Sequence, residues 1–198
     1  MKITNPIFIV TFTLLFLLWG VTYSDALLSM EGIWRRSDTF AHGYFILPIS
    51  AWLVWRDKAN LLEQRTQPSW LPIPFLLGSL FVGLFAYSVD INVLGQLSAV
   101  VSLIALIWLV VGNKIAWQYK FPLAFLLFSV PMGENLIPWL QDVTAWFTVN
   151  LLNLNGIPVF RDGLYLQTPT GLFEVAVACS GIRYLIASIA VGTLFAYL

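Results

Sequence analysis

The chain has 198 residues, of which 59% are hydrophobic and only 10% carry a formal charge. Soluble domains have about 25% charged residues, so this composition excludes an ordinary water-soluble globule and indicates a protein embedded in a lipid bilayer. Ten basic residues balance ten acidic ones, which gives no reason to expect a nucleic-acid partner, and a single cysteine excludes an internal disulfide framework.

Apolar stretches along the chain predict about six transmembrane helices. They cover residues 7–24, 43–55, 71–88, 93–111, 121–130 and 182–198. No small-residue cleavage pattern follows the first stretch, so we interpret it as an uncleaved helix rather than a signal peptide. Polar residues interrupt the stretch 136–154, which favours a helix at the membrane interface or along a cavity.

Basic residues between the apolar stretches predict the orientation of the chain, because loops rich in Lys and Arg stay in the cytoplasm. Those that set the orientation are Lys2, Arg56, Lys58, Arg65, Lys114 and Lys120. The N-terminus is therefore expected in the cytoplasm. The segments 25–42 and 132–180 are expected on the opposite, non-cytoplasmic face.

Residues 157–177 predict a small β-hairpin on that outer face. The turn signal Pro169-Thr170-Gly171 lies between two β-prone runs, and Arg161-Asp162-Gly163 marks another turn before the first run. No linker divides the chain, so residues 1–198 are expected to form one domain. The predicted fold class is an all-α polytopic integral membrane protein with about six spans, an interfacial helix and this hairpin.

Cys179 lies between the second β-prone run and the last apolar stretch, next to Ser180 and Gly181. With Ser180 as the helix N-cap, the helix dipole and Arg183 are expected to lower the pKa of the thiol and favour the nucleophilic thiolate. The amides around Ser180 and Gly181 are candidates for an oxyanion hole. Strand, sharp turn and helix together follow the logic of a nucleophile elbow.

Each of these features also has a plainer interpretation. A lone cysteine in a membrane protein is usually a small apolar packing residue, and an arginine at the end of a span often extends to the lipid headgroups. The position of Cys179 favours a use for it, because an unpaired thiol facing an oxidising compartment is a liability.

His42 is the only histidine, and it opens the second apolar stretch on the same predicted face as Cys179. A Cys–His pair would suit acyl transfer, whereas a lone histidine at a helix start is more often a cap or a headgroup contact. Glu134 and Asp142 could line a polar groove for an extended peptide, although interfacial anchoring explains them more simply. No phosphate-binding loop or metal-ligand pattern occurs, so no cofactor or metal is expected.

The stretch "ACSGIRYLIAS", residues 178–188, resembles the signature around the nucleophile of exosortases, the multi-span membrane transpeptidases of Gram-negative bacteria. The stretch "HGYFILPISAWLVWR", residues 42–56, and the region 125–163 are similar to the same family in the same order. The resemblance covers nearly the whole chain and is closest to the exosortase A branch. Its most specific part is the Cys-Ser-Gly-x-Arg-Tyr motif.

This resemblance implies a cysteine transpeptidase and protease of the inner membrane that sorts exported proteins and is associated with exopolysaccharide genes. Such an enzyme cleaves near a Pro-Glu-Pro-type motif in a C-terminal sorting signal. It forms a thioester on the residue matching Cys179, which faces the periplasm, and transfers the protein to an acceptor. The implied partners are exported proteins with this signal and membrane lipid. The oligomeric state is not predicted.

The catalytic arginine and histidine of the family belong to spans after the cysteine motif, in a region that would follow Leu198. The resemblance therefore implies a C-terminally truncated chain that is inactive alone, and neither role transfers to Arg183 or His42. Arg183 matches the motif itself, where it would position the substrate or bias the thiolate. The alternative function is a non-catalytic membrane component, either a scaffold for exported proteins or a transporter fragment.

Overall fold

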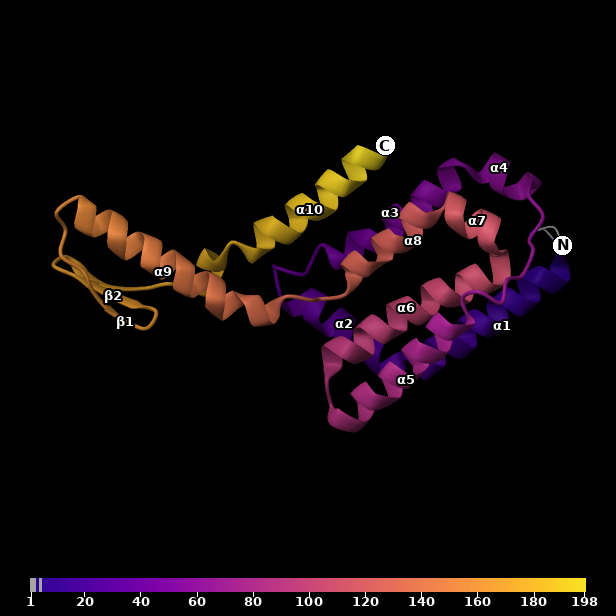
Figure 1. Ribbon diagram of the computed structural model, residues 1–198, viewed down its shortest axis with the longest axis horizontal. Coiled ribbons are helices and arrows are strands. Elements are labelled where there is room, and N and C mark those ends of the chain that lie inside the picture. The colour runs from indigo at the N-terminus through magenta and orange to yellow at the C-terminus, as the bar shows by residue number, and fades with distance from the viewer. Residues whose placement is uncertain (1–2, 4) are drawn as a thin grey trace. The chain divides into compact units, whose positions relative to one another are not determined.

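The computed structural model describes residue 3 and residues 5–198 (Figure 1). Lys2, one of the residues used above to orient the N-terminus, lies outside the described residues. The chain folds into two compact units, Met1–Pro131 and Met132–Leu198.

The first unit is built from helices, and α6 lies at its centre. Its elements are α1 (Pro6–Thr22), α2 (Ser24–Arg36), α3 (Gly43–Arg56), α4 (Lys58–Glu63), α5 (Ile73–Val89), α6 (Asn92–Val111), α7 (Asn113–Gln118), α8 (Lys120–Phe125) and the 3₁₀ turn η1 (Leu126–Ser129). The helix α6 packs against α1, α2, α5, α7 and η1, and Figure 1 shows α5 and α6 side by side. Its small residues, among them Ala99 and Ser102, are fully buried, which allows this close packing.

The helix α2 was not expected, because residues 25–42 were predicted only as a segment between two spans. Asp25 lies in its first turn and Arg35 and Arg36 in its last, so the charges offset the helix dipole. The indole nitrogen of the buried Trp34 donates to the carbonyl oxygen of Ser129 at 2.9 Å, which anchors α2 to η1. Tertiary contacts and end charges therefore stabilise an amphipathic helix that is too polar on average to be recognised as an apolar stretch.

Length and composition show which helices are able to cross a bilayer. Within the described residues, α6 alone is a single unbroken helix that is long and apolar enough. The pair α1 and α2, bent by 71°, and the pair of segments Lys120–Ser129 and Glu134–Leu154 also pass if each pair is one broken span, which gives up to three. The apolar helices α5 and α10 are shorter, with 17 and 16 residues. The structure supports a mostly helical membrane protein, and the count of six spans stays a prediction.

The second unit combines two long helices with a small sheet. Its elements are η2 (Glu134–Leu136), α9 (Ile137–Leu154), β1 (Phe160–Asp162), β2 (Tyr165–Thr168), β3 (Gly171–Glu174), the 3₁₀ turn η3 (Val177–Ser180) and α10 (Ile182–Tyr197). The strands form an antiparallel sheet in the order β1-β2-β3. A core of Ala145, Leu166 and Val175 joins this sheet to α9, beside which it lies in Figure 1.

The predicted hairpin corresponds to β2 and β3, which pair from Thr168↔Gly171 to Tyr165↔Glu174. The sheet also contains a third strand, β1, which was not predicted. The turn expected at residues 161–163 begins later, because Arg161 and Asp162 pair with β2 and only Gly163 enters the turn. Gly163 has a φ of 57°, a left-handed conformation that glycine adopts without strain.

Candidate functional site

Cys179 is exposed and lies in η3, the single 3₁₀ turn between β3 and α10. Its backbone N–H donates to the carbonyl oxygen of Ala176 at 2.9 Å, which closes the turn. Its own carbonyl oxygen accepts a hydrogen bond of 3.0 Å from the hydroxyl of Thr144 on α9. The turn that presents the thiol is therefore tied to a long helix.

The N-cap of α10 is Gly181, and the expectation that Ser180 would fill this position is wrong. Gly181 has a φ of 68°, and its carbonyl oxygen accepts the first helical hydrogen bond, from Leu185 at 3.1 Å. This left-handed conformation favours glycine, because a Cβ at such a residue meets the following carbonyl. Ser180 is buried one residue earlier, and its hydroxyl still accepts from the N–H of Ile182, at 3.5 Å.

The backbone of Gly181 also bears on the predicted oxyanion hole. Within the described part of the chain, its N–H makes no backbone hydrogen bond to another residue. A backbone amide beside a thiol can stabilise the negative charge that develops on the carbonyl oxygen when the sulfur bonds to the carbonyl carbon. An oxyanion hole at the Gly181 amide stays a prediction.

Arg183 and His42 were the other candidates. Arg183 lies in the first turn of α10, with an exposed side chain. His42 precedes α3 in the first unit, and its Nδ1 lies 3.1 Å from the carbonyl oxygen of Thr39. Cys179 belongs to the second unit, so a Cys–His pair stays a prediction, as does a role for Arg183.

A groove of about 650 Å³ lies beside Cys179, between α9 and the sheet. Apolar side chains dominate it, and its polar groups are four threonine hydroxyls, one carboxylate and the thiol. The residues that line it are Thr144, Thr148, Leu152, Gly156, Ile157, Pro158, Leu166, Thr168, Pro169, Thr170, Phe173, Glu174, Val175 and Cys179. Cys179, the chain's only cysteine, is one of the lining residues, and its exposed thiol is a strong nucleophile when ionised.

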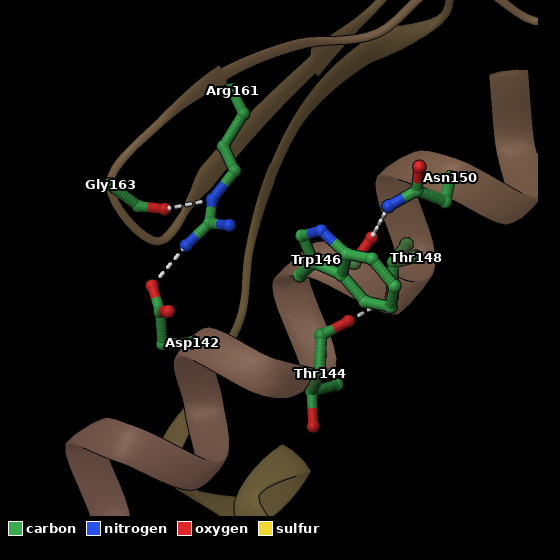
Figure 2. A network of polar contacts seen from close by, with 7 residues as sticks. All are labelled: Asp142, Thr144, Trp146, Thr148, Asn150, Arg161 and Gly163. Atoms are coloured by element: carbon green, nitrogen blue, oxygen red, sulfur yellow. Dashed lines mark hydrogen bonds and ion pairs between the residues drawn. The ribbon is translucent and has the colours of Figure 1, made fainter.

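A polar network on the side of α9 fixes the sheet to this helix (Figure 2). Arg161 of β1 forms an ion pair with Asp142, and its Nε donates to the carbonyl oxygen of Gly163 at 2.8 Å. Arg161, predicted to lie in a turn with Asp162 and Gly163, is therefore a β1 residue that pairs with α9. The guanidinium reaches α9 instead, and the groove at Cys179 is lined by residues other than Asp142 and Glu134.

The polar residues of the stretch 136–154 indicated a helix at the membrane interface or along a cavity, and Thr144 and Thr148 of α9 line the groove. The two α9 residues that hold the cysteine segment were not predicted from the sequence. Gln141 is buried, and its Nε2 donates to the carbonyl oxygen of Val175 at 2.7 Å. A signal was present in the sequence: Gln141, Thr144 and Thr148 follow a spacing of three and four residues, which places them on one face of a helix. A polar stripe in an otherwise apolar helix indicates a face that meets polar partners.

Comparison with known families identifies the chain. The family described as transmembrane exosortase (Exosortase_EpsH) matches residues 34–198, which include the groove and Cys179. The chain belongs to the transmembrane exosortase family. Membership places it in a class of membrane cysteine transpeptidases and proteases in general. No curated protein and no solved structure matches the chain.

The match confirms the resemblance seen in the sequence, and the family's membrane setting agrees with the apolar helices of this exosortase. The site around Cys179 consists of protein groups that suit acyl chemistry: a thiol, a backbone amide and threonine hydroxyls. Among the described residues, no group of three or more His, Cys, Asp or Glu side chains is placed to hold a metal ion.

Proposed function

We propose that this exosortase is a membrane-embedded cysteine transpeptidase that cleaves the C-terminal sorting signal of exported proteins. The observation that carries the proposal is the position of Cys179, an exposed thiol in the lining of an apolar groove in a chain of this family. In this account the groove faces the periplasm and the protein resides in the inner membrane, with its N-terminus in the cytoplasm.

The reaction has two balanced steps. In the first, the Cys179 thiolate attacks the scissile carbonyl carbon, a C–S bond forms, and the C–N bond of the peptide breaks. The leaving amine takes up the proton that the thiol released. In the second, a nucleophile of the acceptor attacks the thioester carbonyl, the C–S bond breaks, and the sulfur regains a proton. The N–H of Gly181 supports the oxyanion in both tetrahedral intermediates.

The shape and lining of the groove support a peptide substrate. Its volume of about 650 Å³ lies within the usual range for ligand sites, and its apolar wall removes water from a bound segment. The Glu174 carboxylate and the hydroxyls of Thr168 and Thr170 offer partners for backbone N–H groups, which would otherwise be desolvated without compensation. An extended, mostly uncharged segment beside the Pro-Glu-Pro-type motif fits this environment.

A gel assay for a covalent intermediate tests the proposal. The protein, expressed from its complete reading frame in inner-membrane vesicles, is mixed with a labelled substrate that carries a sorting signal. We expect a hydroxylamine-sensitive adduct on the wild-type protein and none on Cys179→Ala. Cleavage of the substrate by Cys179→Ala at the wild-type rate would contradict the proposal.

The same assay separates the enzyme from the non-catalytic alternative. A scaffold would retain the substrate on the membrane without cleaving it and without forming an adduct, and Cys179→Ala would retain it equally well. A transpeptidase shows both the adduct and the cleaved product. The roles of Arg183 and His42, and of further proton-transfer residues, stay predictions that the same substrate assay addresses.

A further inference from the structure

The segment that carries Cys179 is held at both ends by one face of α9. At its start, the carbonyl oxygen of Val175 accepts from Nε2 of Gln141 at 2.7 Å. At its end, the carbonyl oxygen of Cys179 accepts from the hydroxyl of Thr144 at 3.0 Å. The two donors are three residues apart on the helix, so they project from the same face. We call Gln141 and Thr144 the α9 clamp.

The first bond of the α9 clamp lies in the protein interior. Gln141 is 6% exposed and Val175 also 6%. Burial of an amide side chain in an apolar environment is costly unless its groups are hydrogen-bonded. Gln141 therefore needs its bond to Val175, and a change that removes the donor leaves a buried carbonyl without a partner.

The second bond acts on the turn itself. A 3₁₀ turn of four residues has poor hydrogen-bond geometry and little stability of its own. The bond from Thr144 to Cys179 joins this turn to α9, an α-helix of 18 residues. Nucleophilic attack depends on placement within a fraction of an ångström, since a displacement of about 1 Å costs on the order of 100-fold in rate.

We propose that Gln141 and Thr144 are positioning residues, which fix the Cys179 turn against α9 so that the sulfur is aimed into the groove. The effect of these residues on catalysis rests on the proposed function. Their effect on the position of the turn rests on the hydrogen bonds alone. Neither residue exchanges protons or bonds with the substrate in this scheme. Each acts through the backbone of the segment from Val175 to Cys179.

The test compares Thr144→Val, which keeps the shape of the side chain and removes its donor, with Thr144→Ser, which keeps the donor. The control is Thr148→Val, because the Thr148 hydroxyl donates to the carbonyl of Thr144 within α9, at 2.8 Å, and not to the turn. Hydrogen exchange is measured by mass spectrometry on the peptide that contains residues 175–182, in the full chain in lipid nanodiscs.

We expect exchange in this peptide to be about twofold to tenfold faster in Thr144→Val, the range that corresponds to the loss of one hydrogen bond. Thr144→Ser and Thr148→Val should exchange like the wild type. Gln141→Met should accelerate exchange at the Val175 end of the same peptide. Unchanged exchange in a folded Thr144→Val protein overturns the inference.

A kinetic measurement then separates the two proposals. If the proposed function holds, Thr144→Val lowers the maximal rate of adduct formation on Cys179 by about tenfold or more, and Thr144→Ser restores it. Faster exchange with an unchanged maximal rate refutes the positioning role. If exchange is faster in Thr144→Val but the wild-type protein forms no adduct, the proposed function is refuted. The α9 clamp then only stabilises the position of the turn.

Discussion

The replacement of Gly181 by alanine tests the backbone conformation that places Cys179 before α10. The φ of 68° at this residue costs about 1–2 kcal/mol for a residue with a Cβ. No heavy atom lies within 4 Å of the position that the new Cβ would occupy, so steric contact adds nothing to this cost. Gly181→Ala is therefore expected to lower the free energy of unfolding by about 1–2 kcal/mol.

Gly192 provides a matched control in the same helix. It lies inside α10, has no positive φ, and has no heavy atom within 4 Å of a Cβ position. Alanine is the better helix former by about 1 kcal/mol, so Gly192→Ala should stabilise the protein. Gly181→Asn should fall between wild type and Gly181→Ala, because asparagine tolerates the left-handed region. The two alanine variants should thus differ by about 2–3 kcal/mol.

Reversible unfolding in mixed detergent micelles measures these differences on the full chain. The same preparations report adduct formation on Cys179, which should fall in Gly181→Ala and not in Gly192→Ala. Equal stability of the two alanine variants would refute the left-handed turn at Gly181, and with it the geometry assigned to the cysteine segment.

Two further predictions concern the first unit. Gly43→Ala should destabilise the protein by about 1–3 kcal/mol in a thermal unfolding assay, because the new Cβ would meet the Trp34 ring, with an indole atom at 2.5 Å. A Gly43→Ala protein as stable as the wild type would contradict this close contact. At the end of α3, the hydrogen bond that the Tyr119 hydroxyl donates at 2.8 Å is the main reason why the pKa of Asp57 lies below its usual value. The stabilisation is present above the unfolded pKa of about 3.9 and is lost as the pH falls through the lower folded pKa. Tyr119→Phe should therefore be less stable than the wild type near neutral pH and should lose less stability on acidification. Parallel curves of stability against pH for the two proteins would refute this.

Local patterns in the sequence were sufficient to predict the long apolar helices. The expected stretch 93–111 corresponds to α6 (Asn92–Val111), and 71–88 corresponds to α5 (Ile73–Val89), within about two residues at each end. An unbroken run of apolar residues carries its own signal, because burial in lipid or protein stabilises it whatever the neighbours are. The hairpin of β2 and β3 was also predictable, since its turn residues follow one another in the chain.

The elements that were missed depend on partners distant in the sequence. The helix α2 is anchored through Trp34 to a residue 95 positions away, which no local pattern encodes. The strand β1 is only three residues long and exists through its pairing with β2. Short elements of this kind gain their stability from tertiary contacts rather than from propensity.

The residues of the candidate site were also only partly predictable from the sequence. Cys179 and Gly181 could be named from the motif and from the turn that a helix start requires. The α9 clamp could not, because Gln141 and Thr144 meet their partners 34 and 35 residues further along the chain. A cavity along the stretch 136–154 was one of two expectations, but the residues of β2 and β3 that complete its lining were not predicted. The N-cap was misassigned to Ser180, whose hydroxyl does approach the first turn but from one residue outside the helix.

The central claim is that Cys179 is an outward-facing thiol in a peptide-binding groove, and labelling of this residue in intact spheroplasts tests it most directly. Since the chain has one cysteine, a membrane-impermeant maleimide reports this residue alone. We expect labelling without permeabilisation, and protection by a peptide that carries the sorting motif. Labelling that requires permeabilised membranes, or that the peptide leaves unchanged, would contradict it.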